Sequence, residues 1–164
     1  MALDTTIGGV TADSYVTLAE YQARATALGW TLAATDAANE INLRNAARSI
    51  DAVYSFVGVK QYQYQALSWS RLVNEIVNDW PVNPDTIPLK IKQAQMEMAY
   101  LIQGGADALA TIDGIIKRKR EKLDVIEEET EYFGGKGNPS YPAVTKMLRG
   151  YIIGGPDQSR MIRG

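Results

Sequence analysis

The 164-residue sequence contains neither cysteine nor histidine. Without cysteine, disulfides, thiolate nucleophiles and cysteine-based zinc or iron–sulfur sites are excluded. Without histidine, a Ser-His-Asp triad is excluded, and transition metals lose their commonest side-chain ligand. The chemistry left is that of carboxylates, of a Lys or Tyr base, or of a magnesium site. These absences favour a protein that is not an enzyme, with no catalytic residues, no metal and no cofactor.

Long apolar runs are also absent, since none approaches the roughly 18–20 residues that span a bilayer. Residues 1–4 show no basic and apolar leader, so we expect no membrane contact and a protein that stays in the cytoplasm where it is made. The net charge is −2, and this lack of basic excess argues against a protein that lives by binding nucleic acid. The length fits one domain with one modest core.

The first half of the chain predicts two helices after a lead-in of ten residues, which we expect to be extended or mobile. Thr17 and Glu20 have capping-box spacing, and Gly29 follows the apolar positions, so a short helix is predicted between them. A longer helix is predicted from about residue 36 to 57, capped by Thr35 or Asp36 and ended by Gly58. Its apolar positions recur at steps of three and four: Leu43, Ala46, Ala47, Ile50, Val53, Tyr54 and Val57.

Residues 59–86 hold several Tyr and Trp residues and, later, two prolines. This composition predicts a loop pinned by its aromatic side chains, with a turn or two of helix at residues 72–77. Pro88 suits the first turn of a third helix, which Gly104-Gly105 ends. The apolar face of that helix is formed by Ile91, Ala94, Met98, Leu101 and Ile102.

A charged segment follows, basic at residues 117–122 and acidic at residues 127–131. Two strands paired as a hairpin would set the basic run against the acidic run, and opposite charges across strands stabilise such pairs. A single charged helix is the competing interpretation, because i,i+4 charge pairs would form there too. We prefer the hairpin. Consecutive glutamates on a strand point to opposite faces, which favours a solvated edge over a magnesium site.

The chain ends with a glycine-rich linker at residues 134–139 and a short amphipathic helix opened by Pro142. The last eight residues are too short and polar to fold alone, so they are disordered or ordered by a partner. The expected fold is mainly α: a small helical bundle with a short β-hairpin and an extended C-terminal arm ending in a short helix and tail. The expected division is a helical core domain at 1–114, the hairpin at 115–133, and the linker, helix and arm at 134–164.

Two function classes fit these features. Aromatic side chains beside cations hold single-stranded nucleic acid, but here the aromatics lie mostly at residues 62–80 and the cations have acidic partners nearby. The glycine pairs lack the context of a phosphate-binding loop. A helical domain with a hairpin, a linker and an amphipathic helix is more typical of docking to another subunit.

A series of short motifs runs along the chain: Ala-Asp-Ser-Tyr-Val-Thr-Leu-Ala-Glu-Tyr at 12–21, Gly29-Trp30, Ala-Ala-Arg-Ser-Ile-Asp at 46–51, Gln-Ala-Leu-Ser-Trp-Ser-Arg at 65–71, Ile87-Pro88, Ala-Gln-Met-Glu-Met-Ala at 94–99 and Ile-Lys-Arg-Lys-Arg-Glu-Lys at 116–122. In this order, the motifs resemble a bacteriophage family catalogued as DnaT-like single-stranded-DNA-binding proteins. The resemblance covers about residues 12–153. The family often has Trp-Pro-Arg where this chain has Trp69-Ser70-Arg71.

Members of this family are similar to head–tail adaptor proteins of tailed bacteriophages, also called head-completion or connector proteins. The resemblance implies a structural virion protein of the neck, between head and tail. It implies a homo-oligomer, a twelve-fold ring that docks under the portal protein, extends the DNA channel and joins the head to the next neck or tail-completion protein. Genomic DNA would pass through without sequence-specific contact. The alternative function is a single-stranded-DNA-binding protein of the replication type.

The resemblance also implies roles for two segments. About Tyr141 to Gly164 would clasp the portal, and residues 115–132 would pair subunits around the ring. The implied portal-binding side chains are Tyr141, Val144, Met147, Leu148, Tyr151, Ile152, Arg160, Met161 and Ile162. The implied inter-subunit hairpin side chains are Lys117, Lys119, Arg120, Glu127, Glu129 and Glu131.

Overall fold

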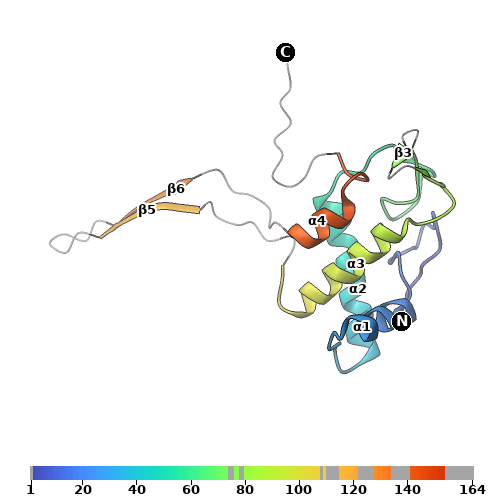
Figure 1. Ribbon diagram of the computed structural model, residues 1–164, viewed down its shortest axis with the longest axis horizontal. Coiled ribbons are helices and arrows are strands. Elements are labelled where there is room, and N and C mark those ends of the chain that lie inside the picture. Colours follow the sequence, from blue (N-terminus) through green and yellow to red (C-terminus); the bar gives the residue numbers. More distant parts are fainter. Residues whose placement is uncertain are drawn as a thin grey trace, which may run out of the picture.

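The structure, a computed structural model, describes residues 2–73, 76–77, 80–107, 109, 115–121, 128–133 and 141–153. In this part of the chain, four helices form one body, and an antiparallel hairpin projects from it (Figure 1). Three two-stranded antiparallel sheets accompany the helices. The mainly helical fold with a β-hairpin predicted from the sequence is therefore confirmed.

Helix α1 spans Leu18–Leu28 and has the predicted ends. The Thr17 hydroxyl accepts from the Glu20 backbone N–H at 3.2 Å, and the Glu20 carboxylate accepts from the Thr17 N–H at 2.8 Å. Gly29 ends the helix in the left-handed conformation, at φ 71°, which glycine adopts without steric strain. Both predicted ends of this helix are confirmed.

Helix α2 spans Asp36–Val53, and Thr35 caps its start as predicted. The predicted end at Gly58 is wrong, because the backbone is already extended at Tyr54. The reason lies far along the chain. The Val57 N–H donates to the Tyr151 carbonyl at 3.0 Å, and the Ile153 N–H donates to the Ser55 carbonyl at 2.7 Å. If α2 continued to residue 57, the backbone of residues 55–57 would turn into the helix and these two bonds would be lost.

The segment after α2 contains four two-residue strands. Strand β1 (Val59–Lys60) pairs with β2 (Arg71–Leu72), and β3 (Ile76–Val77) pairs with β4 (Trp80–Pro81), both antiparallel. The turn or two of helix predicted at residues 72–77 is therefore wrong. Periodicity cannot separate a helix from strands in so short an apolar run. Pairing with the neighbouring strands, β2 with β1 and β3 with β4, decided the outcome.

Helix α3 spans Leu89–Gln103, directly after Pro88, and Gly104 follows its last residue. It is the central helix of the body, because it packs against both α2 and α4. Helix α4 spans Pro142–Leu148, with proline in its first turn as predicted. The core joins side chains from all four helices and from the segment between α2 and α3: Tyr21, Leu43, Ile50, Trp69, Ile91, Met98, Val144 and Leu148.

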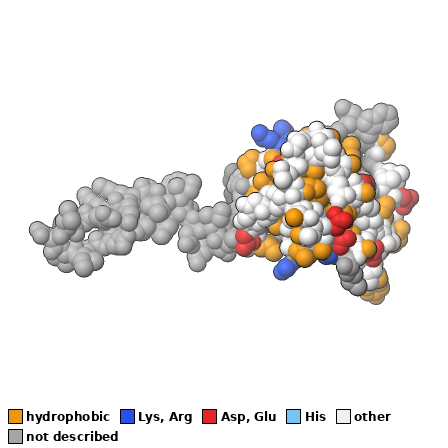
Figure 2. Space-filling view, turned by 90° about the horizontal axis from the view of Figure 1, so that it is seen from below, with side chains coloured by type: hydrophobic (Ala, Val, Ile, Leu, Met, Phe, Trp, Pro, Cys, Tyr) orange, Lys and Arg blue, Asp and Glu red, His pale blue; other side chains and the backbone are white. Residues whose placement is uncertain are grey.

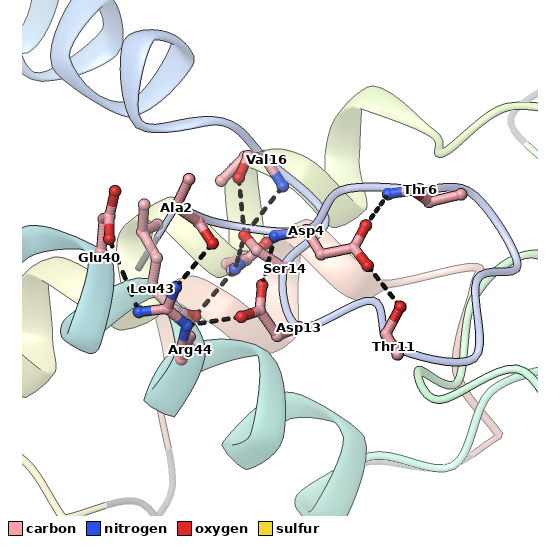
Figure 3. A network of polar contacts seen from close by, with 11 residues as sticks. Ala2, Asp4, Thr6, Thr11, Asp13, Ser14, Val16, Glu40, Leu43 and Arg44 are labelled. Atoms are coloured by element: carbon pink, nitrogen blue, oxygen red, sulfur yellow. Dashed lines mark hydrogen bonds and ion pairs between the residues drawn. The ribbon is translucent and has the colours of Figure 1, made fainter.

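The N-terminal lead-in, which was expected to be extended or mobile, is held against α2 by hydrogen bonds and an ion pair (Figure 3). The Asp13 carboxylate accepts from the Asp4 N–H at 2.8 Å and forms an ion pair with Arg44 at 2.5 Å. Arg44 also donates to the Ala2 carbonyl at 3.1 Å. Within the described residues, no helix has the length and apolar character needed to cross a membrane.

Candidate functional site

The β5–β6 hairpin is the first candidate site, because it extends away from the helical body (Figure 1). Strand β5 spans Ile115–Glu121 and β6 spans Glu128–Phe133. Arg118 lies directly opposite Glu131, and Arg120 lies directly opposite Glu129. The hairpin predicted from the sequence is confirmed, and its register sets basic positions against acidic ones as expected.

The other predicted hairpin residues fall at different places in this register. Lys119 lies opposite Thr130, so it has no acidic residue directly across from it. Lys117 lies at a register irregularity between Ile116 and Arg118, where one strand carries an extra residue. Glu127 lies outside the described residues. At the base of the hairpin, apolar residues pair across the strands, Ile115 with Phe133 and Ile116 with Tyr132.

The predicted portal-binding side chains of residues 141–153 pack in or against the helical core, whereas side chains of an extended arm would project from it. Val144 and Leu148 are fully buried, and Tyr151 is almost so. The other three, Tyr141, Met147 and Ile152, are partly buried against the same core. Helix α4 thus belongs with the helical core in space, although a boundary at residue 134 was expected to separate them. Arg160, Met161 and Ile162 lie outside the described residues.

Specific contacts hold this C-terminal segment in place. The Tyr54 and Thr145 hydroxyls are hydrogen-bonded at 2.9 Å, and Phe56 forms an antiparallel bridge with Ile152. The indole of Trp69 packs edge-on against both Phe56 and Tyr151, with ring centroids 5.7 Å apart in each pair. Any contact between these buried side chains and a partner would require α4 to leave the core.

A buried polar network, here called the buried lock, connects the N-terminal segment to the helices. Its centre is Gln95 of α3, which is fully buried. The Gln95 amide oxygen accepts from the Tyr15 N–H at 2.9 Å. Its amide nitrogen donates to the Ser14 hydroxyl at 2.8 Å and to the Leu43 carbonyl at 2.9 Å. A buried polar side chain with every group paired fixes one arrangement of the elements that it joins.

The second part of the buried lock is the Asp51 carboxylate. It accepts from the Tyr15 hydroxyl at 2.5 Å and from the Ser68 N–H at 2.6 Å. The backbone N–H of Trp69 donates to the Tyr15 hydroxyl oxygen at 3.2 Å. Burial raises the pKa of Asp51, although the hydrogen bonds from Tyr15 and Ser68 act in the opposite direction.

Arg71 fixes the backbone between α2 and β2. Its guanidinium donates to four carbonyl oxygens, at 2.6–3.3 Å, from Phe56, Val57, Gly58 and Ser68. Beside it, the Ser70 hydroxyl donates to the Gln61 amide oxygen at 2.6 Å. Ser70 stands where the family often has proline, so here a side-chain hydrogen bond helps to hold the loop.

The motifs that carry the family resemblance meet in this network. Residues 12–21 supply Ser14 and Tyr15, residues 46–51 supply Asp51, and residues 94–99 supply Gln95. Residues 65–71 supply Ser68, Trp69 and Arg71. These residues bond to one another or to backbone groups, so their role in this fold is to hold it together. The network was not predicted from the sequence. The one signal that could have indicated it is the presence of polar residues, such as Ser14, Asp51 and Gln95, within otherwise apolar motifs.

The carboxylates of α2 are dispersed and engaged in separate contacts. Asp36 accepts from Gln22 at 2.9 Å, Glu40 lies 3.7 Å from Arg44, and Asp51 belongs to the buried lock. Among the residues that the structure describes, no group of three or more Asp or Glu side chains is arranged to hold a metal ion.

The aromatic side chains differ in their ability to stack on a base. Trp69 is 1% exposed. Trp30 stacks on Tyr100, with centroids 4.5 Å apart, and the Arg24 guanidinium lies 5.7 Å from the Trp30 ring centre. Tyr62 and Tyr64, in contrast, are 48% and 75% exposed. Figure 2 shows one face of the body, on which Lys and Arg side chains are few and separated.

The fold and these contacts define a helical protein with an internally bonded core and a projecting charged hairpin. A family model described as "Putative DnaT-like ssDNA binding protein" matches residues 1–164, so the chain belongs to this family. The family recognised from the sequence motifs is thereby confirmed. Searches of curated proteins and of solved structures find no match to this chain.

Proposed function

We propose that this protein is a structural, non-enzymatic subunit of an assembly, and specifically a head–tail adaptor of a tailed bacteriophage. The observation that carries the proposal is the β5–β6 hairpin, which projects from a body with its own core (Figure 1). A two-stranded hairpin alone is marginally stable in water, and its unpaired strand edges are templates for pairing with another chain. A hairpin of this kind fits a contact between subunits.

A ring is the assembly that fits best. One subunit's hairpin contacting a different surface of the next subunit is a heterologous contact, which closes into a ring when the rotation per subunit allows it. The twelve-fold symmetry, the portal protein above, the next neck or tail-completion protein below and the location in the virion neck all come from the family resemblance. DNA would pass through this ring without sequence-specific contact.

The burial of α4 narrows the proposed portal clasp. Val144 and Leu148 are fully buried in the body, so they support the fold rather than an interface. We therefore assign the clasp to residues 154–164, which include Arg160, Met161 and Ile162. Limited proteolysis of the free protein should leave residues 141–153 protected with the helical body.

The test is assembly with the portal protein encoded in the same genome. The two proteins are mixed and examined by native mass spectrometry and electron microscopy. The expected result is a portal ring carrying about one adaptor subunit for each portal subunit. A variant lacking residues 154–164 should lose the complex while keeping its fold, as measured by circular dichroism. Absence of binding by the intact chain would contradict the proposal. The position of the gene relative to portal and capsid genes is an independent check.

The second candidate function is binding of single-stranded DNA, which the family description favours. Strand β5 carries four consecutive cations at residues 117–120, which supply the charge that such binding needs. Binding of a labelled oligonucleotide, measured by fluorescence anisotropy at about 50 mM and about 200 mM salt, tests this candidate. Tight, strongly salt-dependent binding would favour it over the adaptor, and weak binding at both salt concentrations would exclude it.

A further inference from the structure

The exposed apolar side chains gather on one part of the body. Eleven large hydrophobic side chains are exposed in the described residues, and six come from two segments, 7–10 and 59–72. We call these six the tyrosine patch: Ile7, Val10, Val59, Tyr62, Tyr64 and Leu72.

The two segments of the tyrosine patch touch each other. The Gly9 carbonyl accepts from the Ala66 N–H at 3.0 Å. The Tyr62 ring lies so close to Gly8 that a β-carbon on this glycine would come within 2.3 Å of it. Val59 and Leu72 are directly opposite each other in the β1–β2 pair. The patch is therefore one surface rather than scattered residues.

Two glutamines form hydrogen bonds that hold the loop carrying Tyr62 and Tyr64 in one conformation. Gln65 is buried, and its amide oxygen accepts from the Tyr62 N–H at 3.0 Å, while its nitrogen donates to the Leu67 and Ser70 carbonyls. Gln61 accepts from Ser70 and donates to Asp85. A rigid loop presenting tyrosines loses little conformational entropy on binding, which is the property of a strong contact surface.

The tyrosine patch combines exposed aromatic rings with neighbouring carboxylates, and such groups can bind a cationic side chain. Residues 52–74 contain no Asp or Glu and only two cations, Lys60 and Arg71, and Arg71 is bonded to backbone carbonyls. Two carboxylates border the patch: Asp85, bonded to Gln61, and Asp4, whose pKa is lowered by hydrogen bonds from Thr6 and Thr11. Aromatic rings flanked by carboxylates attract Lys and Arg through cation–π and charge interactions.

The β5 strand has the matching chemistry, with cations at residues 117–120. Figure 1 shows the hairpin at one end of the long axis of the molecule, and the strands and N-terminal loop near the other end. A chain therefore cannot place its own hairpin on its own patch, but a neighbouring copy can. Such a contact repeats from subunit to subunit, as a ring requires.

We propose that the tyrosine patch of each subunit receives the β5–β6 hairpin of the neighbouring copy, with Lys119 and its neighbours on β5 against Tyr62 and Tyr64. This inference rests on the proposed function and adds the surface on which the hairpin docks. The Glu residues of β6 would meet Lys60, which is exposed, directly follows Val59 of the patch and donates to the Gln65 carbonyl at 3.3 Å.

The absence of native cysteine makes disulfide mapping unambiguous. The test variant carries Gln63→Cys and Thr130→Cys, since Gln63 is exposed between Tyr62 and Tyr64 and Thr130 lies opposite Lys119 in the hairpin. The control carries Leu28→Cys and Thr130→Cys, because Leu28 is exposed outside the patch, at the end of α1. Both variants are oxidised over a range of concentrations, alone and with the portal protein, and analysed by non-reducing electrophoresis and native mass spectrometry.

The expected result is a ladder of covalent oligomers from the test pair and little cross-linking in the control. If oligomers form but the two pairs cross-link equally, the docking surface is wrong while the adaptor function stands. If the native chain stays monomeric under all conditions, alone and with the portal protein, both fail. A second measurement uses Tyr64→Ser, which should weaken self-association about tenfold. Tyr64→Phe keeps the aromatic side chain and should change self-association less than about twofold. Equal effects of the two substitutions would overturn the cation–π contact.

Discussion

The helical body and the β5–β6 hairpin differ in what stabilises them. The body buries Trp69, Leu43 and Leu148 in one core, and the buried amide of Gln95 is fully hydrogen-bonded within the same chain. The hairpin extends from the body, and only its two strands pair with each other (Figure 1). The difference indicates that the body folds by itself, whereas the hairpin needs another surface to become stable.

This comparison gives the family motifs a physical meaning. Most of them lie in the body and end in the buried lock, around Gln95 and Asp51. One motif, residues 116–122, lies mainly in the hairpin and takes no part in that lock. The first group specifies the fold, and the hairpin motif is the part that the proposed assembly uses. The following predictions test this division, from the largest effect to the smallest.

Truncation of Leu148 in α4 should destabilise the body strongly. Leu148→Ala leaves a cavity beside fully buried neighbours, so we expect a loss of about 3–4 kcal/mol in the free energy of unfolding. Ile153→Ala is the matched control, because Ile153 is 58% exposed and should change stability by less than about 0.5 kcal/mol. Urea unfolding followed by circular dichroism measures both. Equal, small effects would mean that α4 is a detachable arm after all.

Removal of the Asp51 carboxylate should be the next largest effect. Asp51→Ala leaves the Tyr15 hydroxyl and the Ser68 N–H without their acceptor, and we expect a loss of about 2–3 kcal/mol. A double-mutant cycle with Tyr15→Phe should show coupling of about 1 kcal/mol, since the two side chains are bonded. Additive losses would indicate that the hydrogen bond contributes little.

The pH dependence of the same site has a definite sign. Burial raises the pKa of Asp51 above its unfolded value, so the folded chain holds this proton more strongly than the unfolded chain. The resulting stabilisation is complete below the unfolded pKa and is lost as the pH rises through the folded pKa. Asp51→Asn should remove this fall from the pH profile of the unfolding free energy. An unchanged profile would contradict the assignment.

Substitution of Tyr21 tests the body at alkaline pH. Its hydroxyl is buried without a hydrogen-bond partner, and burial, with smaller contributions from Tyr100 and Glu97, raises its pKa to about 12. This stabilisation is present below pH 10 and is lost as the pH rises to about 12. Tyr21→Phe should flatten that loss and raise stability at neutral pH by about 1 kcal/mol. Tyr62→Phe, at an exposed ring, is the control and should do neither.

Excision of the hairpin should have the smallest effect on the body. Replacing residues 115–133 with a short Gly-Ser linker should change the free energy of unfolding by less than about 0.5 kcal/mol, because the body has its own core. The same variant should lose all self-association in native mass spectrometry, because the hairpin is proposed to contact the neighbouring copy. A loss of more than about 2 kcal/mol would show that the hairpin is part of the folding unit and would contradict the conclusion that the body folds without it.

Local sequence signals predicted several features well. Thr17, Glu20 and Gly29 mark the ends of α1 through hydrogen bonds and backbone preferences that involve only near neighbours. Pro88 and Gly104 did the same for α3, and the neighbouring basic and acidic runs predicted the hairpin. These predictions held because each depends on residues that are close in the sequence.

Most of the errors involve contacts between distant residues, and the end of α2, for example, depends on the Tyr151 carbonyl. The strands at residues 71–77 are different, because β2 pairs with β1 and β3 pairs with β4, which follows after a short separation. That error arose because periodicity does not separate helix from strand in a short apolar run. The lead-in is fixed by Arg44, which is far from Asp13 in the sequence. The candidate docking surface was also missed, because nothing local shows that Val10 and Tyr62 belong to one patch.

Residue identity and short-range spacing were enough to predict the helix caps, the hairpin and the absence of cysteine and histidine chemistry. Tertiary contacts were needed to show that α4 lies in the core, that the family motifs form a buried lock, and that exposed tyrosines gather far from the hairpin. Those outcomes depend on which distant groups satisfy each other's hydrogen bonds and fill each other's space, and the chain settles both only when it folds.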